Sequence, residues 1–143
     1  MELSRKAQAI EPSLTLAITA KAKEMKEKGI DVISFSAGEP DFNTPKNIIN
    51  AAIKAMEDGN TKYTSVNGIL QLREAICKKF KDDNGLEYNP SQIVVSTGAK
   101  QSLANTFLAI LNPGDEVIVS TPYWVSYPEL IKLADGKPVF VEG

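Results

Sequence analysis

Histidine is absent from this sequence of 143 residues, and cysteine occurs once, at Cys77. Without histidine the chain lacks the most common general base and metal ligand, which excludes histidine-based catalytic triads and zinc sites. A single cysteine forms no internal disulfide. The apolar runs, such as residues 93–95, fall far below the roughly 20 residues of a membrane span, and the amino terminus has no signal-peptide core. We therefore expect a cytoplasmic protein with no metal site and no membrane partner.

A surplus of positive charge is also missing. Sixteen Lys and Arg stand against eighteen Asp and Glu, which gives a net charge of −2. Such a chain has no excess charge to neutralise a phosphate backbone, so we expect no nucleic-acid partner. Hydrophobic residues make up 43% and charged residues 24% of the sequence, which is ordinary for a folded globular protein with one core.

Apolar residues at three- and four-residue spacing predict several helices. Ser13 is the expected N-cap of the first helix, and Gly29 is expected to close it. Thr44 is expected to cap the second helix, with Pro45 in its first turn. Residues 1–12 are predicted to form an arm. The predicted helices cover residues 14–28, 45–56, 69–84 and 127–134, and a further helix after Lys100 contains Leu103, Phe107, Leu108 and Leu111.

Continuous apolar runs predict strands at residues 93–96, 117–119 and 139–141, and a short strand at 32–35. Strand, helix and strand in succession favour an α/β fold with a parallel sheet covered on both faces. With three good strands, the apolar edges of that sheet would be unpaired. Either a partner covers those edges, or the chain is the front part of a longer protein.

Three places in the sequence are candidate ligand sites. A predicted strand runs through Gly98 into a helix, an arrangement in which backbone N–H groups and the helix dipole converge on an anion. The P-loop and Gly-x-Gly-x-x-Gly patterns are absent, and a plain tight turn explains the same residues. Gly38 can bring the backbone close to a ligand or serve a turn. Trp124 follows the carboxyl end of a strand, where it can stack on a ligand or fill the core.

Five blocks of sequence occur in an order that resembles a known family. They resemble the amino-terminal part of the fold-type I, pyridoxal-phosphate-dependent aspartate aminotransferases of the bacterial class I type, over essentially the whole chain. The resemblance implies an incomplete aminotransferase-like fold, with residues 1–44 as arm and small-domain segment and 45–143 as the first part of the large cofactor-binding domain. The blocks are Ser36-Ala37-Gly38-Glu39-Pro40-Asp41-Phe42, Thr61-Lys62-Tyr63, Gly68-Ile69 with Leu72-Arg73-Glu74-Ala75, Ser96-Thr97-Gly98-Ala99-Lys100-Gln101, and Asn112-Pro113-Gly114-Asp115-Glu116-Val117 through Thr121-Pro122-Tyr123-Trp124.

The resemblance implies pyridoxal 5'-phosphate as the cofactor of the full-length enzyme. Trp124 looks like the ring that stacks on the cofactor's pyridine, next to the substrate. The turn at Gly98 and the backbone amides of Ala99 and Lys100 would then hold the cofactor phosphate. The family also tends to have a cis peptide bond before this tryptophan, so we expect Thr121-Pro122 to be cis.

The resemblance also implies a homodimer and a pair of substrates. Tyr63 matches the tyrosine whose hydroxyl reaches the phosphate bound in the neighbouring subunit. Gly38 matches the residue whose backbone N–H meets the substrate carboxylate. The implied reaction moves an amino group between aspartate, or a related amino acid, and a 2-oxo acid. Glu11 stands where a lysine has been linked to prephenate activity in the family, which counts against that activity here.

The lysine that binds the cofactor as a Schiff base lies, in the family, beyond the position of Gly143. The chain is therefore expected to be an amino-terminal fragment with half of an active site, inactive by itself. One alternative is a non-catalytic domain that binds a phosphorylated ligand or a partner through the Gly98 turn and the exposed sheet edge. Another is a superfamily member that acts on aromatic or alanine-like substrates.

Overall fold

The computed structural model describes residues 2–143. These residues form two compact units, which are described separately. The first unit combines the segment that ends at Glu39 with Ala99–Gly143, and the second is Pro40–Gly98. A domain boundary at residues 44/45 remains a prediction from the sequence. No helix among the described residues is long and apolar enough to cross a membrane.

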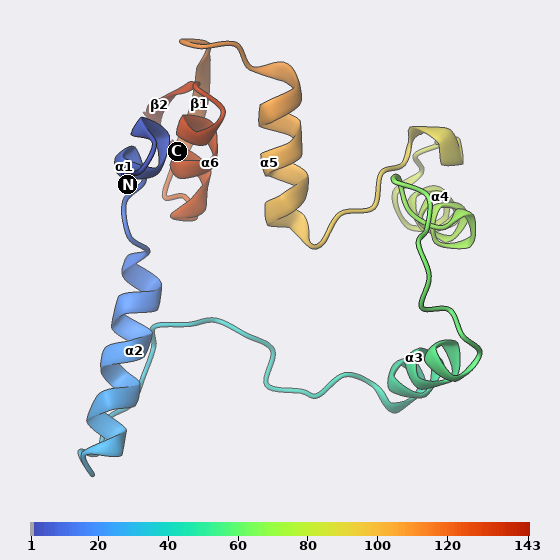
Figure 1. Cartoon of the computed structure of the whole chain (residues 1–143), viewed down its shortest axis with the longest axis horizontal. Helices are drawn as coiled ribbons and strands as arrows, with labels where there is room; N and C mark the ends of the chain where they lie inside the picture. Colours follow the sequence, from blue (N-terminus) through green and yellow to red (C-terminus); the bar gives the residue numbers. More distant parts are fainter. Residues whose placement is uncertain (1) are drawn as a thin grey trace. The chain divides into compact units, whose positions relative to one another are not determined.

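The first unit is built around a small parallel sheet. Strands β1 and β2 pair in parallel, from Glu116 opposite Lys137 to Thr121 opposite Glu142. Parallel neighbours need a crossover connection, and α6 supplies it by packing on both strands. Ile131 of α6 is 1% exposed and lies in the core of this unit with Val119 and Ala134. The elements are α1 (Arg5–Ala9), α2 (Leu14–Glu27), α5 (Ala99–Ile110), β1 (Glu116–Thr121), α6 (Ser126–Leu133) and β2 (Lys137–Glu142) (Figure 1).

The second unit contains two helices and a short 3-10 turn. These elements are α3 (Lys46–Glu57), α4 (Leu70–Asn84) and η1 (Pro90–Gln92). Gly85 ends α4 in the left-handed conformation, with φ +67°, which glycine adopts without steric cost. Asn89 caps η1 through a reciprocal capping box with Gln92. Ile93, directly after η1, is the buried hydrophobic residue of this unit.

The strands predicted at residues 93–96 and 32–35 are not formed, so the expectation of a three-stranded sheet is wrong for the described residues. The backbone at Ile93 is extended, with φ −105° and ψ 130°. An extended segment becomes a strand only when a neighbouring strand completes its hydrogen-bond ladder. Here the N–H of Val95 donates to the carbonyl of Asn67, in a loop, at 3.1 Å. The strands predicted at 117–119 and 139–141 are confirmed within the longer β1 and β2.

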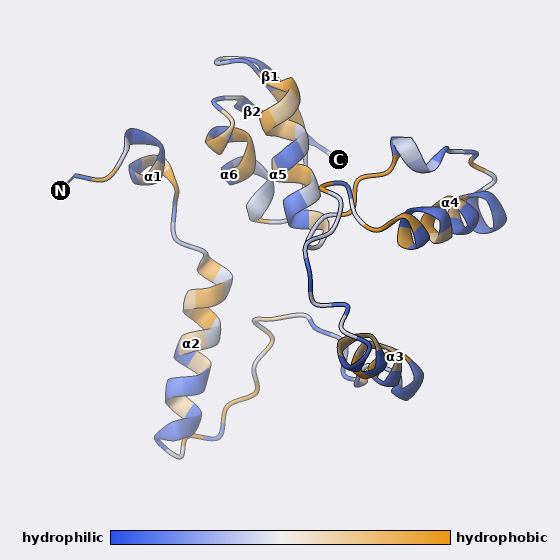
Figure 2. Cartoon of the chain, turned by 45° about the vertical axis from the view of Figure 1, so that its right-hand side comes forward, coloured by the Kyte–Doolittle hydropathy of each residue, from blue (hydrophilic) through white to orange (hydrophobic). Residues whose placement is uncertain are grey.

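Helix ends follow the sequence signals in part. The Ser13 hydroxyl accepts from the N–H of Leu16, which confirms Ser13 as the N-cap of α2, and Gly29 follows the helix with φ +76°. The cap predicted at Thr44 is wrong, because Pro45 is itself the N-cap of α3 and no side chain caps that helix. Figure 2 shows that α2 is apolar near its start and hydrophilic near its end, where its lysines and glutamates gather.

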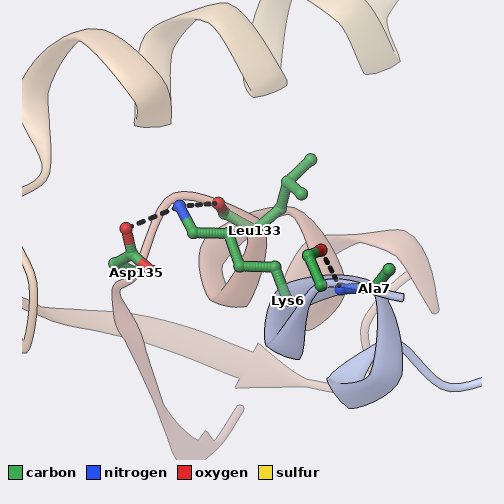
Figure 3. Close-up of polar contacts among 5 residues, drawn as sticks. Lys6, Ala7, Leu133 and Asp135 are labelled. Carbon is green, nitrogen blue, oxygen red and sulfur yellow. Dashed lines mark hydrogen bonds and ion pairs between the residues drawn. The ribbon is translucent and has the colours of Figure 1, made fainter. Parts of the chain in front are cut away.

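The segment predicted to be an arm contains α1 and contacts the far end of α6. The ammonium of Lys6 lies 2.6 Å from the Asp135 carboxylate and donates to the Leu133 carbonyl at 3.4 Å (Figure 3). A cation at this position also faces the negative end of the α6 dipole. Both side chains of the Lys6–Asp135 pair are half exposed, so the pair orients α1 more than it stabilises the unit.

Candidate functional site

The residues after β1 place two aromatic rings in different surroundings. The Thr121-Pro122 peptide bond is cis, as predicted. Tyr123 stacks on Phe140 of β2, with ring centroids 5.0 Å apart and an angle of 21° between the planes. Trp124 remains 51% exposed. Tyr123 therefore has an aromatic partner within the unit, although both rings remain partly exposed, whereas the indole of Trp124 is left accessible to a ligand.

Trp124 lines a hollow of about 540 Å³ within the first unit. Residues 10–16 form one wall of this hollow, and α6 forms another. Lys100, in the first turn of α5, lines it as well. The structure thus brings together two of the residues singled out in the sequence, one cationic and one aromatic.

The start of α5 supplies hydrogen-bond donors beside Lys100. The helix begins at Ala99, and the first N–H groups of any helix have no intrahelical acceptor. Gly98 precedes it with φ +82°, and a Cβ built on Gly98 would meet no atom within 4 Å. The glycine is therefore required for its backbone conformation and not for close packing. A turn of this kind before a helix suits an anion, although no strand leads into it here.

A carboxylate that the sequence did not single out ties the segment at Glu11 to α6. Glu129 of α6 accepts from the N–H of Glu11 at 3.2 Å through one oxygen and from the Lys132 ammonium at 2.8 Å through the other. The hydrogen bond that the Lys132 ammonium donates to Glu129, more than the charge of Glu129, raises the pKa of Lys132. The i,i+3 spacing of Glu129 and Lys132 on a predicted helix indicates that these two side chains can form an ion pair. The contact with Glu11, 118 residues away, had no signal in the sequence.

Gly38 and Tyr63 were also singled out in the sequence. Gly38 lies in a segment without helix or strand, and a Cβ added at this position would meet no atom within 4 Å. It is not among the residues that line the hollow. Tyr63 lies in the second unit, in the loop between α3 and α4, with a fully exposed ring. Within residues 2–143, no three His, Cys, Asp or Glu side chains gather into a group that could hold a metal ion.

Known proteins similar to this chain are aminotransferases. The aspartate aminotransferase of Bacillus subtilis (strain 168) is 59% identical over 143 residues, all of this chain and 36% of that protein. The aspartate/prephenate aminotransferase of Nitrosomonas europaea is 54% identical over 142 residues, or 99% of this chain and 36% of that protein. The chain thus spans about 36% of the length of these relatives and corresponds to their amino-terminal third.

Solved structures agree with the sequence comparison. The aspartate aminotransferase from Thermus thermophilus with maleate has a TM-score of 0.95 and 51% identity, covering 99% of this chain and 37% of that one. The alanine aminotransferase from Pyrococcus furiosus has a TM-score of 0.92 at 33% identity, covering 99% of this chain and 36% of that one. The expected fold is confirmed: the α/β structure is part of the aminotransferase fold. Because the model of aminotransferase class I and II matches residues 30–142, the chain belongs to that family.

Proposed function

We propose that this chain is the amino-terminal part of an aminotransferase that moves an amino group between aspartate, or a related amino acid, and a 2-oxo acid. Family membership supports the reaction class, and relatives named aspartate aminotransferases support aspartate as a substrate. The single observation that carries the proposal is the hollow shared by Lys100 and Trp124. It combines a cation in the first turn of α5, which suits an anion, with an accessible aromatic face for a planar ring.

The residues present fit the cofactor that the family implies, pyridoxal 5'-phosphate. The turn at Gly98 and the backbone amides of Ala99 and Lys100 would hold its phosphate, because the first amides of a helix lack an intrahelical acceptor and a nearby ammonium favours a bound anion. Trp124 would stack on its pyridine ring, because the indole is half exposed toward the hollow. When bound, the cofactor supplies an electron sink for bond changes at the carbon that carries the amino group. The chain's own residues bind and orient it.

We call the proposed cofactor site at Ala99, Lys100 and Trp124 the cup. Gly38 and Tyr63 have proposed roles outside the cup. Gly38 would donate its backbone N–H to the substrate carboxylate, and the open space around it leaves room for that approach. Tyr63 would reach the cofactor phosphate of a second subunit in a homodimer. The full exposure of the ring leaves its hydroxyl available for such a contact. Both roles rest on the match of these positions to the family.

A fluorescence titration tests the proposed cup. Trp124 is the only tryptophan of the chain, so intrinsic tryptophan fluorescence reports directly on stacking at this ring. Pyridoxamine 5'-phosphate is the appropriate probe, since it lacks the aldehyde that would react with surface lysines. We expect saturable quenching by this probe, competition by inorganic phosphate, and much weaker quenching by pyridoxamine without phosphate. Equal quenching by both amines, or none, would contradict the assignment of the cup.

A further inference from the structure

Arg73 of α4 bridges two backbone carbonyls that lie far apart in the sequence. Its Nε donates to the carbonyl of Gly68 at 3.1 Å, and its Nη1 donates to the carbonyl of Pro90 at 2.8 Å. The side chain is half-buried, and no carboxylate of residues 2–143 forms an ion pair with it. A cation that donates to two carbonyls in partly buried surroundings forms stronger hydrogen bonds than a neutral donor. Arg73 therefore holds the start of α4 against η1.

Close packing at Gly68 ties the same loop to the segment that follows η1. Gly68 has φ +98°, and a Cβ there would lie 2.6 Å from Cγ2 of Val95 and 2.8 Å from its Cβ. The N–H of Val95 also donates to the carbonyl of Asn67, the residue before Gly68. The backbone at residues 67–68 is thus in direct contact with residue 95. We call Arg73, Gly68 and Val95, with the carbonyls of Asn67 and Pro90, the loop clamp.

The loop clamp joins two pieces of chain that carry proposed phosphate contacts. On one side, the loop between α3 and α4 carries Tyr63 and ends at the clamp. On the other side, Val95 precedes Gly98 by three residues, and Gly98 opens the turn into α5. Movement of Val95 would be passed through this short connection to the phosphate turn.

We propose that Arg73 is a positioning residue for cofactor binding. It fixes the position of the loop that carries Tyr63 relative to the turn at Gly98. The inference rests on the proposed function, because the roles of Tyr63 and Gly98 come from there. Arginine suits the task because its planar fork presents several N–H donors in a fixed geometry. A lysine ammonium is a compact point charge on a flexible stem and reproduces that fork poorly.

Amide hydrogen exchange of the chain, measured residue by residue without any ligand, tests the loop clamp itself. The variants are Arg73→Met, which keeps side-chain length, and Arg73→Lys, which keeps the charge. Lys78→Met is the matched control. It also removes a cation from α4, but the side chain of Lys78 is 76% exposed. The reporters are the amides of Val95 and Gly68, which bond to Asn67 and Ser65, with the amide of Cys77 inside α4 as reference.

We expect Arg73→Met to raise exchange at Val95 and Gly68 by about tenfold and to leave Cys77 unchanged, because local opening is governed by local contacts. The exchange rates of Arg73→Lys should lie between those of Arg73→Met and those of the unsubstituted chain. Lys78→Met should leave the exchange rates unchanged. Unchanged exchange at Val95 would overturn the clamp. An equal rise at Cys77 would overturn it as well, because it would show a general loss of stability.

A titration with pyridoxamine 5'-phosphate, followed by Trp124 fluorescence, tests the link to the cofactor. Arg73→Met should weaken the affinity by about threefold or more, because misplaced donors bind an anion less well, and Lys78→Met should not. Raised exchange at Val95 with unchanged affinity would overturn the positioning role. If the unchanged chain fails to bind the probe, the proposed function fails instead, and the exchange of Val95 still decides whether the clamp exists.

Discussion

Lys100 and Trp124 come from different elements and line the same hollow, one in the first turn of α5 and the other just beyond β1. The pairing matters because each residue alone has an ordinary structural explanation. A lysine near a helix start is common on protein surfaces, and a lone tryptophan is usually a packing residue. Together they border one space with a cation and a flat aromatic face, as a phosphorylated aromatic ligand requires.

Replacement of Trp124 separates ligand stacking from core packing. We expect Trp124→Ala to weaken pyridoxamine 5'-phosphate binding by about two- to tenfold, the range of an aromatic pair worth ~0.5–1.5 kcal/mol, with a small change in thermal stability. Isothermal titration calorimetry and a thermal melt on the same sample measure both, and Trp124→Phe is the conservative control. A loss of stability near the ~3–5 kcal/mol of an emptied buried aromatic site, with affinity intact, would show that Trp124 is a core residue.

Two glycines with positive φ should respond differently to alanine. Gly98→Ala places a Cβ in open space and should cost only the left-handed backbone strain, about 1–2 kcal/mol. Gly68→Ala adds a clash with Val95 to similar strain and should cost more than Gly98→Ala. Gly38→Ala, with open space and no positive φ, should change stability by less than about 0.5 kcal/mol. Urea unfolding of the three variants gives the order, and a reversed order for Gly68 and Gly98 would show that the contact with Val95 is loose.

Asp135 adopts a left-handed backbone conformation and also forms the ion pair with Lys6. Two substitutions separate the contributions of these two features to stability. Asp135 has φ +62°, a conformation that asparagine tolerates better than alanine does. We expect Asp135→Asn to lose less than about 1 kcal/mol, the range of an exposed ion pair, and this loss should vanish at high salt. Asp135→Ala should lose more, and the additional loss should be independent of salt. The same salt dependence in both variants would mean that backbone strain is unimportant there.

Alkaline pH should loosen the contact between α6 and the segment at Glu11. The pKa of Lys132 is raised, chiefly by its hydrogen bond to Glu129. A raised pKa contributes stability that is fully present below the unfolded-state pKa and is lost as pH rises through the folded-state pKa. Direct NMR titration of the Lys132 ammonium checks the direction, and Glu129→Gln should return the pKa toward its ordinary value. An unchanged pKa in that variant would exclude Glu129 as the cause.

Local signals in the sequence predicted much of this structure, whereas contacts between distant residues were not predictable. The cap at Ser13 and the helix end at Gly29 follow from the chemistry of single residues. Residues 93–96 have the composition of a strand, yet strand formation depends on a neighbour that the described residues do not provide. The Arg73 contacts with Gly68 and Pro90 depend on tertiary packing, which a single sequence does not display.

Activity of the chain by itself is a separate expectation. We expect the isolated chain to show no transamination of aspartate with 2-oxoglutarate, because no lysine of this sequence matches the family's Schiff-base position. A coupled assay over a range of chain concentrations measures this. Turnover that scales with the chain and survives further purification would contradict the expectation.

The most direct test is a chimera in which this chain replaces the corresponding first 36% of the Bacillus subtilis aspartate aminotransferase, its relative at 59% identity. The proposed function predicts a soluble protein that binds pyridoxal 5'-phosphate and transaminates aspartate with 2-oxoglutarate. Trp124→Ala in the same chimera should reduce kcat. A chimera that folds and binds the cofactor, yet shows no turnover with aspartate or any other amino acid, would contradict the proposal that this chain supplies an aminotransferase half-site.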